Sequence, residues 1–307
     1  MRLASRAAWF SSARQSWRGA LGPPRPATPF DLAVCRTLFF GGALALYARF
    51  DFGGLAGVAE LAWRPVWALQ AFESPPLGAR ALTALRAVWL LALAACCVGL
   101  RPRVSMPLAF VSGAPLLLYA NSVARAYHTD NLLFWGLYAF AVWGASVRLP
   151  AAWVVGFLRA MLVLVFCAAG ASKLRNSGLA WADPDTFGSL VVIKSLAWDR
   201  AVPHPELSAW IAERRGLLAV LAASALACEL AAPAALLSRA AAAILVPALF
   251  AMQCGIWLLL GIPFPQTLLC YVFWVPWDRL WPSGWRPGSA AGGRAAASTG
   301  APGDPRR

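Results

Sequence analysis

The chain has 307 residues, of which 60% are hydrophobic and 13% charged, with a formal net charge of +14 and a mean hydropathy of +0.61. A soluble domain carries about 45–50% apolar and about 25% charged residues. The composition therefore excludes a soluble globule. It favours an all-α polytopic membrane protein, built as a single helical bundle without a second folded domain.

The chain begins with a basic segment, residues 1–30, which contains five arginines and no Asp or Glu. Within it, residues 9–21 are amphipathic at helical spacing, with Trp9, Ala13 and Trp17 on one side and the arginines opposite. We interpret the segment as a cytoplasmic leader with a short interfacial helix. An arginine-rich, acid-free start is also typical of a mitochondrial transit peptide, and the sequence leaves this alternative open.

Apolar stretches long enough to cross a bilayer follow the leader, and we expect about eight transmembrane helices over residues 31–280. Arg101-Pro-Arg103 predicts a tight turn between the second and third of them. Residues 281–307, rich in Gly, Ala, Pro and Arg, are interpreted as a disordered tail. The expected spans cover about residues 33–49, 79–100, 104–120, 131–147, 152–172, 216–238, 240–260 and 264–279.

The placement of Lys and Arg predicts the orientation. With eight spans both termini lie on one side, which holds 14 Lys and Arg and three Asp, against ten Lys and Arg and nine Asp and Glu on the other. The basic side is expected to face the cytoplasm. We therefore expect a multi-pass protein of the cytoplasmic (inner) membrane with both termini cytoplasmic. The net charge then needs no nucleic-acid partner. The expected partners are the lipid bilayer and a lipid-soluble small molecule, and the sequence does not identify a protein partner.

Ionisable residues inside the apolar stretches are the first candidates for function, because a charge in hydrocarbon costs about 2.5–3.5 kcal/mol on insertion scales. Counted along the spans at about 1.5 Å per residue, Arg36, Arg159 and Glu229 fall at one depth, roughly 8–10 Å from the inner surface. The guanidinium of arginine pairs well with a carboxylate. We expect the three to form a structural ion cluster.

A second polar layer is expected near the outer surface. His128 precedes the fourth span and Lys173 ends the fifth, so the chain returns both to the same face of the membrane. Arg86 and Gln253 fall at comparable depth. One interpretation is structural, with Lys173 reaching to water and His128 at the interface. The other is catalytic, with Lys173 as a base, His128 assisting, and Arg86 and Gln253 lining a substrate pocket.

The cysteines give no sign of a metal site. All seven fall in apolar stretches, and the sequence contains no Cys-x-x-Cys and no Cys/His ligand spacing. We interpret them as small hydrophobic residues.

Several segments within residues 31–280 resemble, in their order along the chain, the horizontally transferred transmembrane (HTTM) family, which shares its membrane domain with vitamin K-dependent gamma-carboxylase. The segment that ends the fifth span is the most specific of them. The segments are Tyr127-His128-Thr-Asp-Asn-Leu132-Leu, Phe157-Leu-Arg159 with Phe166-Cys-Ala-Ala-Gly170-Ala-Ser-Lys173-Leu174 and Trp181, Cys228-Glu229-Leu-Ala-Ala-Pro233, and Cys254-Gly-Ile-Trp with Gly261-Ile-Pro-Phe264.

The resemblance implies a chemistry. In the carboxylase the lysine of this motif deprotonates a hydroquinone and the histidine assists, roles that would fall on Lys173 and His128. Oxygen then converts the quinol to an epoxide, so a quinol is the implied cofactor. We expect no protein carboxylation, since the family's outer domain has no counterpart after residue 280. The alternative is a non-catalytic bundle that binds a lipid or a partner protein. A transporter is disfavoured because the sequence shows no internal repeat.

Overall fold

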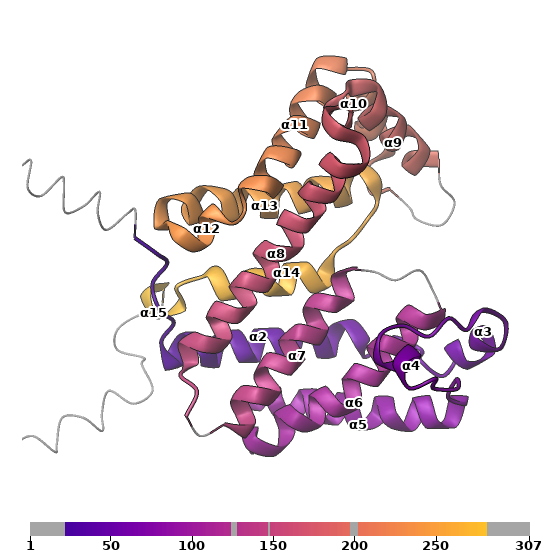
Figure 1. Cartoon of the computed structure of the whole chain (residues 1–307), viewed down its shortest axis with the longest axis vertical. Coiled ribbons are helices and arrows are strands. Elements are labelled where there is room, and N and C mark those ends of the chain that lie inside the picture. Colours follow the sequence, from indigo (N-terminus) through magenta and orange to yellow (C-terminus); the bar gives the residue numbers. More distant parts are fainter. Residues whose placement is uncertain (1–21, 124–127, 147, 197–201, 281–307) are drawn as a thin grey trace, which may run out of the picture.

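The computed structural model describes residues 22–123, 128–146, 148–196 and 202–280, together with their side chains except at 128, 129, 195 and 196. The expected leader helix over residues 9–21 and the expected tail over residues 281–307 lie outside this part of the chain. Every regular element within the described ranges is helical (Figure 1). The expected all-α class is therefore confirmed for these residues.

Seven helices of 17 residues or more run back and forth between two ends of the molecule (Figure 1). They are α2 (Pro29–Tyr47), α5 (Ala79–Val98), α6 (Pro102–Val123), α7 (His128–Ala145), α8 (Ala151–Ser177), α11 (Arg215–Ala231) and α13 (Arg239–Leu260). Shorter elements connect them or end the described chain. These are α3 (Leu55–Ala62), α4 (Ala68–Ala71), η1 (Gly178–Ala182), α9 (Pro184–Leu196), α10 (Pro205–Ala212), α12 (Ala234–Leu237), α14 (Pro265–Cys270), η2 (Tyr271–Trp274) and α15 (Trp277–Leu280).

Five of the helices in the described part are long and apolar enough to cross a membrane: α2, α5, α6, α8 continued by η1, and α13. The expected count of about eight is not confirmed. Helix α7 opens on four polar residues, 128–131, and α11 has 17 residues before the chain turns at Pro233. The expected eighth span is broken into α14 and η2, which lie between Pro263 and Pro276, and α15, which follows Pro276, because proline cannot continue a helix.

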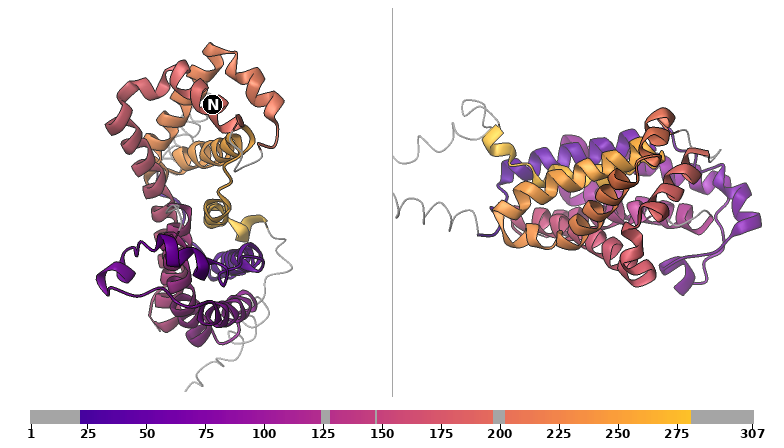
Figure 2. Two further views of the ribbon diagram at one scale, coloured as in Figure 1. Left: turned by 90° about the vertical axis from the view of Figure 1, so that its right-hand side faces the viewer. Right: turned by 90° about the horizontal axis from the view of Figure 1, so that it is seen from above.

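The helices form two groups (Figure 2). One group holds α2, α5, α6 and α7, with α6 packed between α5 and α7 and α2 packed on α5. The other holds α9 to α13. Helix α8 crosses obliquely from the first group to the second, contacting α7 and then α11, and α14 lies between the groups against α2, α7 and α8.

Local sequence explains where several helices begin and end. The Thr28 hydroxyl accepts the backbone N–H of Asp31, and Asp31 accepts the N–H of Thr28, which is a capping box at the start of α2. The other Asp31 carboxylate oxygen accepts the N–H of Asp278 at 2.9 Å, so the same residue fixes α15. Gly99 ends α5 with φ of 76°, a left-handed conformation that glycine adopts without strain.

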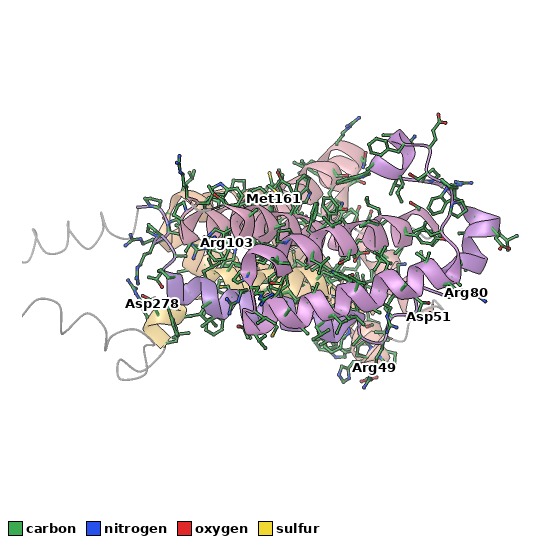
Figure 3. The ribbon with its side chains drawn as sticks, turned by 90° about the horizontal axis from the view of Figure 1, so that it is seen from below. Arg49, Asp51, Arg80, Arg103, Met161 and Asp278 are labelled. Carbon is green, nitrogen blue, oxygen red and sulfur yellow. The ribbon has the colours of Figure 1, made fainter. Side chains whose placement is uncertain are left out.

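The two described ends of the chain lie at one end of the bundle. Asp278 and Arg103 appear at that end in Figure 3, whereas Arg49, Asp51 and Arg80 appear at the opposite end. Arg25, close to the first described residue, pairs with Asp278 at 2.6 Å. The first and last described segments are thus held against each other at one end of the bundle.

Close backbone approach holds the first helix group together. Gly113 of α6 faces the indole of Trp89 on α5, which is fully buried, and a Cβ at Gly113 would overlap that ring. Small residues at helix contacts in membranes permit such an approach. Gly156 on α8 differs, because nothing lies within 4 Å of a Cβ placed there.

We expect Gly113→Ala to lower the free energy of unfolding by about 1–3 kcal/mol, because the overlap must be relieved by moving Trp89 or the α5 backbone. Gly156→Ala is the matched control and is expected to cost nothing, since alanine fits the open space and favours a helix. Thermal unfolding of both variants in detergent measures the difference. A Gly113→Ala protein as stable as the control would contradict the packing described here.

Candidate functional site

A buried ion pair joins α8 to α11. The Lys173 ammonium donates to both carboxylate oxygens of Glu229, at 2.6 and 2.7 Å, and the two side chains are 21% and 4% exposed. Gly170 lies one turn before Lys173, and a Cβ there would come within 2.9 Å of the Glu229 Cβ. The glycine therefore lets the two helices approach closely enough for the short lysine–carboxylate contact. The Lys173 nitrogen also lies 4.9 Å from the ring centroid of Trp181, a cation–π distance.

The expected cluster of Arg36, Arg159 and Glu229 is not what the structure contains. Glu229 pairs with Lys173, and neither arginine makes an ion pair within the described residues. The physical reason is the oblique course of α11 (Figure 1), because counting residues along a tilted helix overestimates depth. Depth also says nothing about which side of the bundle a residue faces.

The two arginines instead bind or approach the ends of other elements. Arg159 donates from Nε to the Phe273 carbonyl at 2.8 Å and from Nη1 to the Arg25 carbonyl at 3.2 Å. Its guanidinium lies 5.4 Å from the Trp274 ring centroid. Arg36 lies against Gly99, where a Cβ would stand 2.8 Å from its terminal nitrogens. Each arginine thus lies beside backbone where a helix ends or the chain turns.

The expected outer pocket is only partly described. Arg86 donates to the Ala48 carbonyl at 2.5 Å and so satisfies the end of α2, and Gln253 on α13 is 8% exposed with no partner for its side-chain oxygen. Within the described residues no hydrogen bond or ion pair joins either of them to Lys173. His128 begins α7, and its side chain lies outside the description. Its expected partnership with Lys173 therefore stays a prediction.

The second histidine belongs to an exposed pair outside the long helices. His204 Nδ1 lies 3.2 Å from the Glu206 carboxylate at the start of α10. The pKa of Glu206 lies below its usual value because its own backbone N–H and His204 both hydrogen-bond to the carboxylate. The pair is a local contact at a helix start and suggests no ligand.

Sequence reasoning missed a polar network among three helices. The Tyr47 hydroxyl of α2 donates to the Asp130 carboxylate at 2.8 Å, and Gln266 of α14 donates to the same oxygen at 2.8 Å. The place of Asp130 just before an apolar stretch is typical of a helix cap, so its position alone gives no sign of this network. The sequence signal for a partner of Asp130 is Gln266, a polar residue inside the stretch expected as a single span.

A cavity of about 770 Å³ opens at the end of the bundle that holds the described termini. Helix α13 and the α14–η2 segment supply its apolar walls. On α13 the lining residues are Ala242, Ala243, Val246, Pro247 and Phe250, and opposite them lie Leu268, Tyr271, Val272 and Trp274. The charged lining residues are Arg25, Arg159, Arg239, Arg279, Asp31 and Asp278.

An extended segment before α2, residues 22–28, forms one wall of this cavity. Its backbone is held by arginines from two other helices. Arg239 donates from its backbone N–H to the Gly22 carbonyl and from Nε to the Pro23 carbonyl, each at 2.9 Å. Arg159 binds the Arg25 carbonyl. The cavity is thus bounded by segments from both ends of the described chain and from its middle.

Within the described part of the chain, no three His, Cys, Asp or Glu residues are placed to hold a metal ion. Comparison of the chain with models of protein families, with curated proteins and with solved structures finds no match. The site must therefore be interpreted from its own geometry.

We expect Lys173→Met to destabilise the protein by about 3–5 kcal/mol, because it leaves the almost fully buried Glu229 charge without a partner. Glu229→Met should cost less, since Lys173 is partly exposed and can reach polar surroundings. The double variant should be more stable than Lys173→Met alone. Thermal unfolding of the three proteins in detergent measures these differences.

Arg215→Met provides the matched control for a broken ion pair. It removes the pair between Arg215 and Asp185, whose side chains are both 66% exposed, and should change stability little. A Lys173→Met protein that resembles this control would contradict the buried pair.

Proposed function

We propose that this chain is a polytopic membrane protein that binds a lipid-soluble molecule in the cavity between α13 and the α14–η2 segment. One observation carries the proposal: the volume of about 770 Å³ with mainly apolar walls and a few polar groups. Sites for small molecules typically measure about 300–1,000 Å³ and have this composition. The cavity is large enough for the polar part and a portion of the apolar part of an amphiphile.

The position of the cavity favours a ligand that arrives from the bilayer. Helix α13 is one of the helices apolar enough to span the membrane, and its lining residues run from Arg239 at the helix start to Phe250 near its middle, so this wall extends from the charged end of the bundle toward the depth of the hydrocarbon. A molecule that partitions into lipid is concentrated at that depth. A strongly hydrated solute is not.

We further propose that the protein is of the HTTM type and lies in the cytoplasmic membrane with both termini cytoplasmic. Two of the segments that carry the resemblance meet in the structure, because Lys173 of one pairs with Glu229 of the other. A pairing that uses the residues singled out by the resemblance supports it. The excess of Lys and Arg on the side of the termini supports the orientation.

A second candidate function is oxygen-dependent chemistry on a quinol. The specific observation in its favour is a charged pair next to an aromatic ring, formed by Lys173, Glu229 and Trp181. The Lys173 side-chain nitrogen donates to both Glu229 oxygens, so the carboxylate is the acceptor of this pair. In this candidate mechanism, Glu229 would accept the hydroxyl proton and Lys173 would stabilise the resulting oxyanion.

Filling the cavity tests the first proposal. Ala243→Trp places an indole in the space, so we expect at least a tenfold loss of any copurifying lipid-soluble molecule, measured by native mass spectrometry. Ala240→Trp on the same helix lies outside the lining and should retain the molecule. Equal retention by both variants would show that the cavity is not the binding site.

Quinol chemistry is tested with a soluble quinol and dissolved oxygen. If the second candidate is right, the wild type consumes the quinol, and Lys173→Met and Glu229→Gln each lose this activity by at least about a hundredfold, as expected for removal of a general acid–base group. Arg86 belongs to the expected pocket, but its side chain binds the end of α2. The quinol turnover of Arg86→Gln shows whether this residue contributes to the reaction. A wild type without turnover would remove this candidate.

A further inference from the structure

The charged end of the cavity carries more positive than negative charge, and binding of an apolar molecule does not explain this excess. Four guanidiniums and two carboxylates line it, and Arg25 is the one of the four that forms an ion pair within the described residues. The two carboxylates are already engaged, Asp278 by Arg25 and Asp31 by backbone N–H groups. The described lining of the cavity thus carries two more guanidiniums than carboxylates, even though the charge of Asp31 acts on Arg159.

The two arginines nearest the extended segment are oriented and still have free N–H groups. Arg159 uses Nε and Nη1 for backbone carbonyls, and Arg239 uses Nε. The terminal nitrogens that make none of these hydrogen bonds can still donate. An arginine held in this way loses little conformational entropy when it binds an anion, and its fork suits the oxygens of a phosphate.

Two further donors, on residues that line the cavity, have no acceptor among the described residues. Tyr271 is 7% exposed, its hydroxyl is buried and it has no hydrogen-bond partner. The indole N–H of Trp274, one turn later, is also buried and unpartnered. A buried polar group without a partner is costly and therefore uncommon in native proteins. Both donor atoms are covered by protein in this structure, so acceptor oxygens on a bound molecule would remove these deficits once the two side chains turn toward the cavity.

From these observations we propose that the molecule in the cavity is an anionic phospholipid. Its phosphate would bind Arg159 and Arg239, its ester oxygens would accept from Tyr271 and Trp274, and its acyl chain would lie along the apolar wall of α13. The inference rests on the proposed function, to which it adds the chemistry of the ligand. Free phosphate would leave the apolar walls without a role, and a neutral lipid would leave the guanidiniums uncompensated.

The excess of positive charge has another explanation, namely the positive-inside signal itself. Such a signal needs arginines only near the inner surface, where they can point into water. Arg159 does not fit this description, because it lies within α8, partly buried against Trp274 and bound to two carbonyls. The position of Arg159 suits the binding of an anion better than a role in setting the orientation of the chain in the membrane.

Binding of defined lipids to the full chain tests the proposal. In nanodiscs or detergent we expect dioleoyl-phosphatidylglycerol to bind about ten- to a hundredfold more tightly than dioleoyl-phosphatidylcholine, because the two phosphates are alike but the choline cation of the latter is repelled by the guanidiniums. Arg239→Gln should reduce this preference at least about fivefold. Arg103→Gln removes the same charge at the same end of the bundle but outside the cavity, and should leave it unchanged.

Tyr271→Phe separates recognition from folding. Because the hydroxyl has no partner in the protein, its removal should leave thermal stability intact while weakening binding of phosphatidylglycerol several-fold. Unchanged binding would show that the hydroxyl takes no part.

The other outcomes are also distinguishable. Equal affinity for the two lipids, abolished in both by Ala243→Trp, would overturn the anionic headgroup but keep the proposed function. No binding of either lipid would overturn the phospholipid, while the proposed function would still be decided by the copurifying molecule in Ala243→Trp and Ala240→Trp. If Arg239→Gln and Arg103→Gln lose the preference for phosphatidylglycerol equally, that preference reflects the general surface charge and not the cavity. Full competition by inorganic phosphate would indicate a phosphate site rather than a lipid site.

Discussion

A charge within an apolar bundle must be compensated where it lies, and the pair of Lys173 and Glu229 meets this requirement between α8 and α11. The two helices belong to different parts of the molecule, since α8 leaves the first helix group and α11 belongs to the second. The pair therefore sets how the second group sits on the oblique helix. The position of α13, which follows α11 through α12, depends on that placement, and so does the cavity that α13 lines.

The sequence predicted the kinds of element better than their number. Hydrophobic composition and length were enough for an all-helical bundle, and the expected turn after α5 appears at Gly99 and Arg101. The expected eighth span failed because three prolines within or beside it outweigh its apolar composition. Its short pieces let the Phe273 carbonyl point to Arg159, which an unbroken helix could not have done.

The candidate site shows where prediction from one chain stops. Lys173, Glu229 and Arg159 were recognised as unusual because each is charged inside an apolar stretch, and each has a specific partner. The identity of those partners depends on tilt and rotation of helices, which spacing does not encode. Gly170 illustrates the difference: its place one turn before Lys173 was visible, but its purpose appears only when Glu229 is seen against it. Tyr271 and Trp274 gave no signal, because aromatic residues in an apolar stretch are unremarkable until their donors are found without acceptors.

Residues 22–28 are held to α8, α13 and α15 by hydrogen bonds and an ion pair, and this has a consequence for biosynthesis. Asp31 must accept the backbone N–H of Asp278, and Arg25 must reach the Asp278 carboxylate, although more than two hundred residues separate them in the chain. While the ribosome is still making the later helices, that end of the bundle lacks its closing wall and stays open to lipid. The cavity therefore receives its lining from Trp274 to Arg279 only when the last described segment docks.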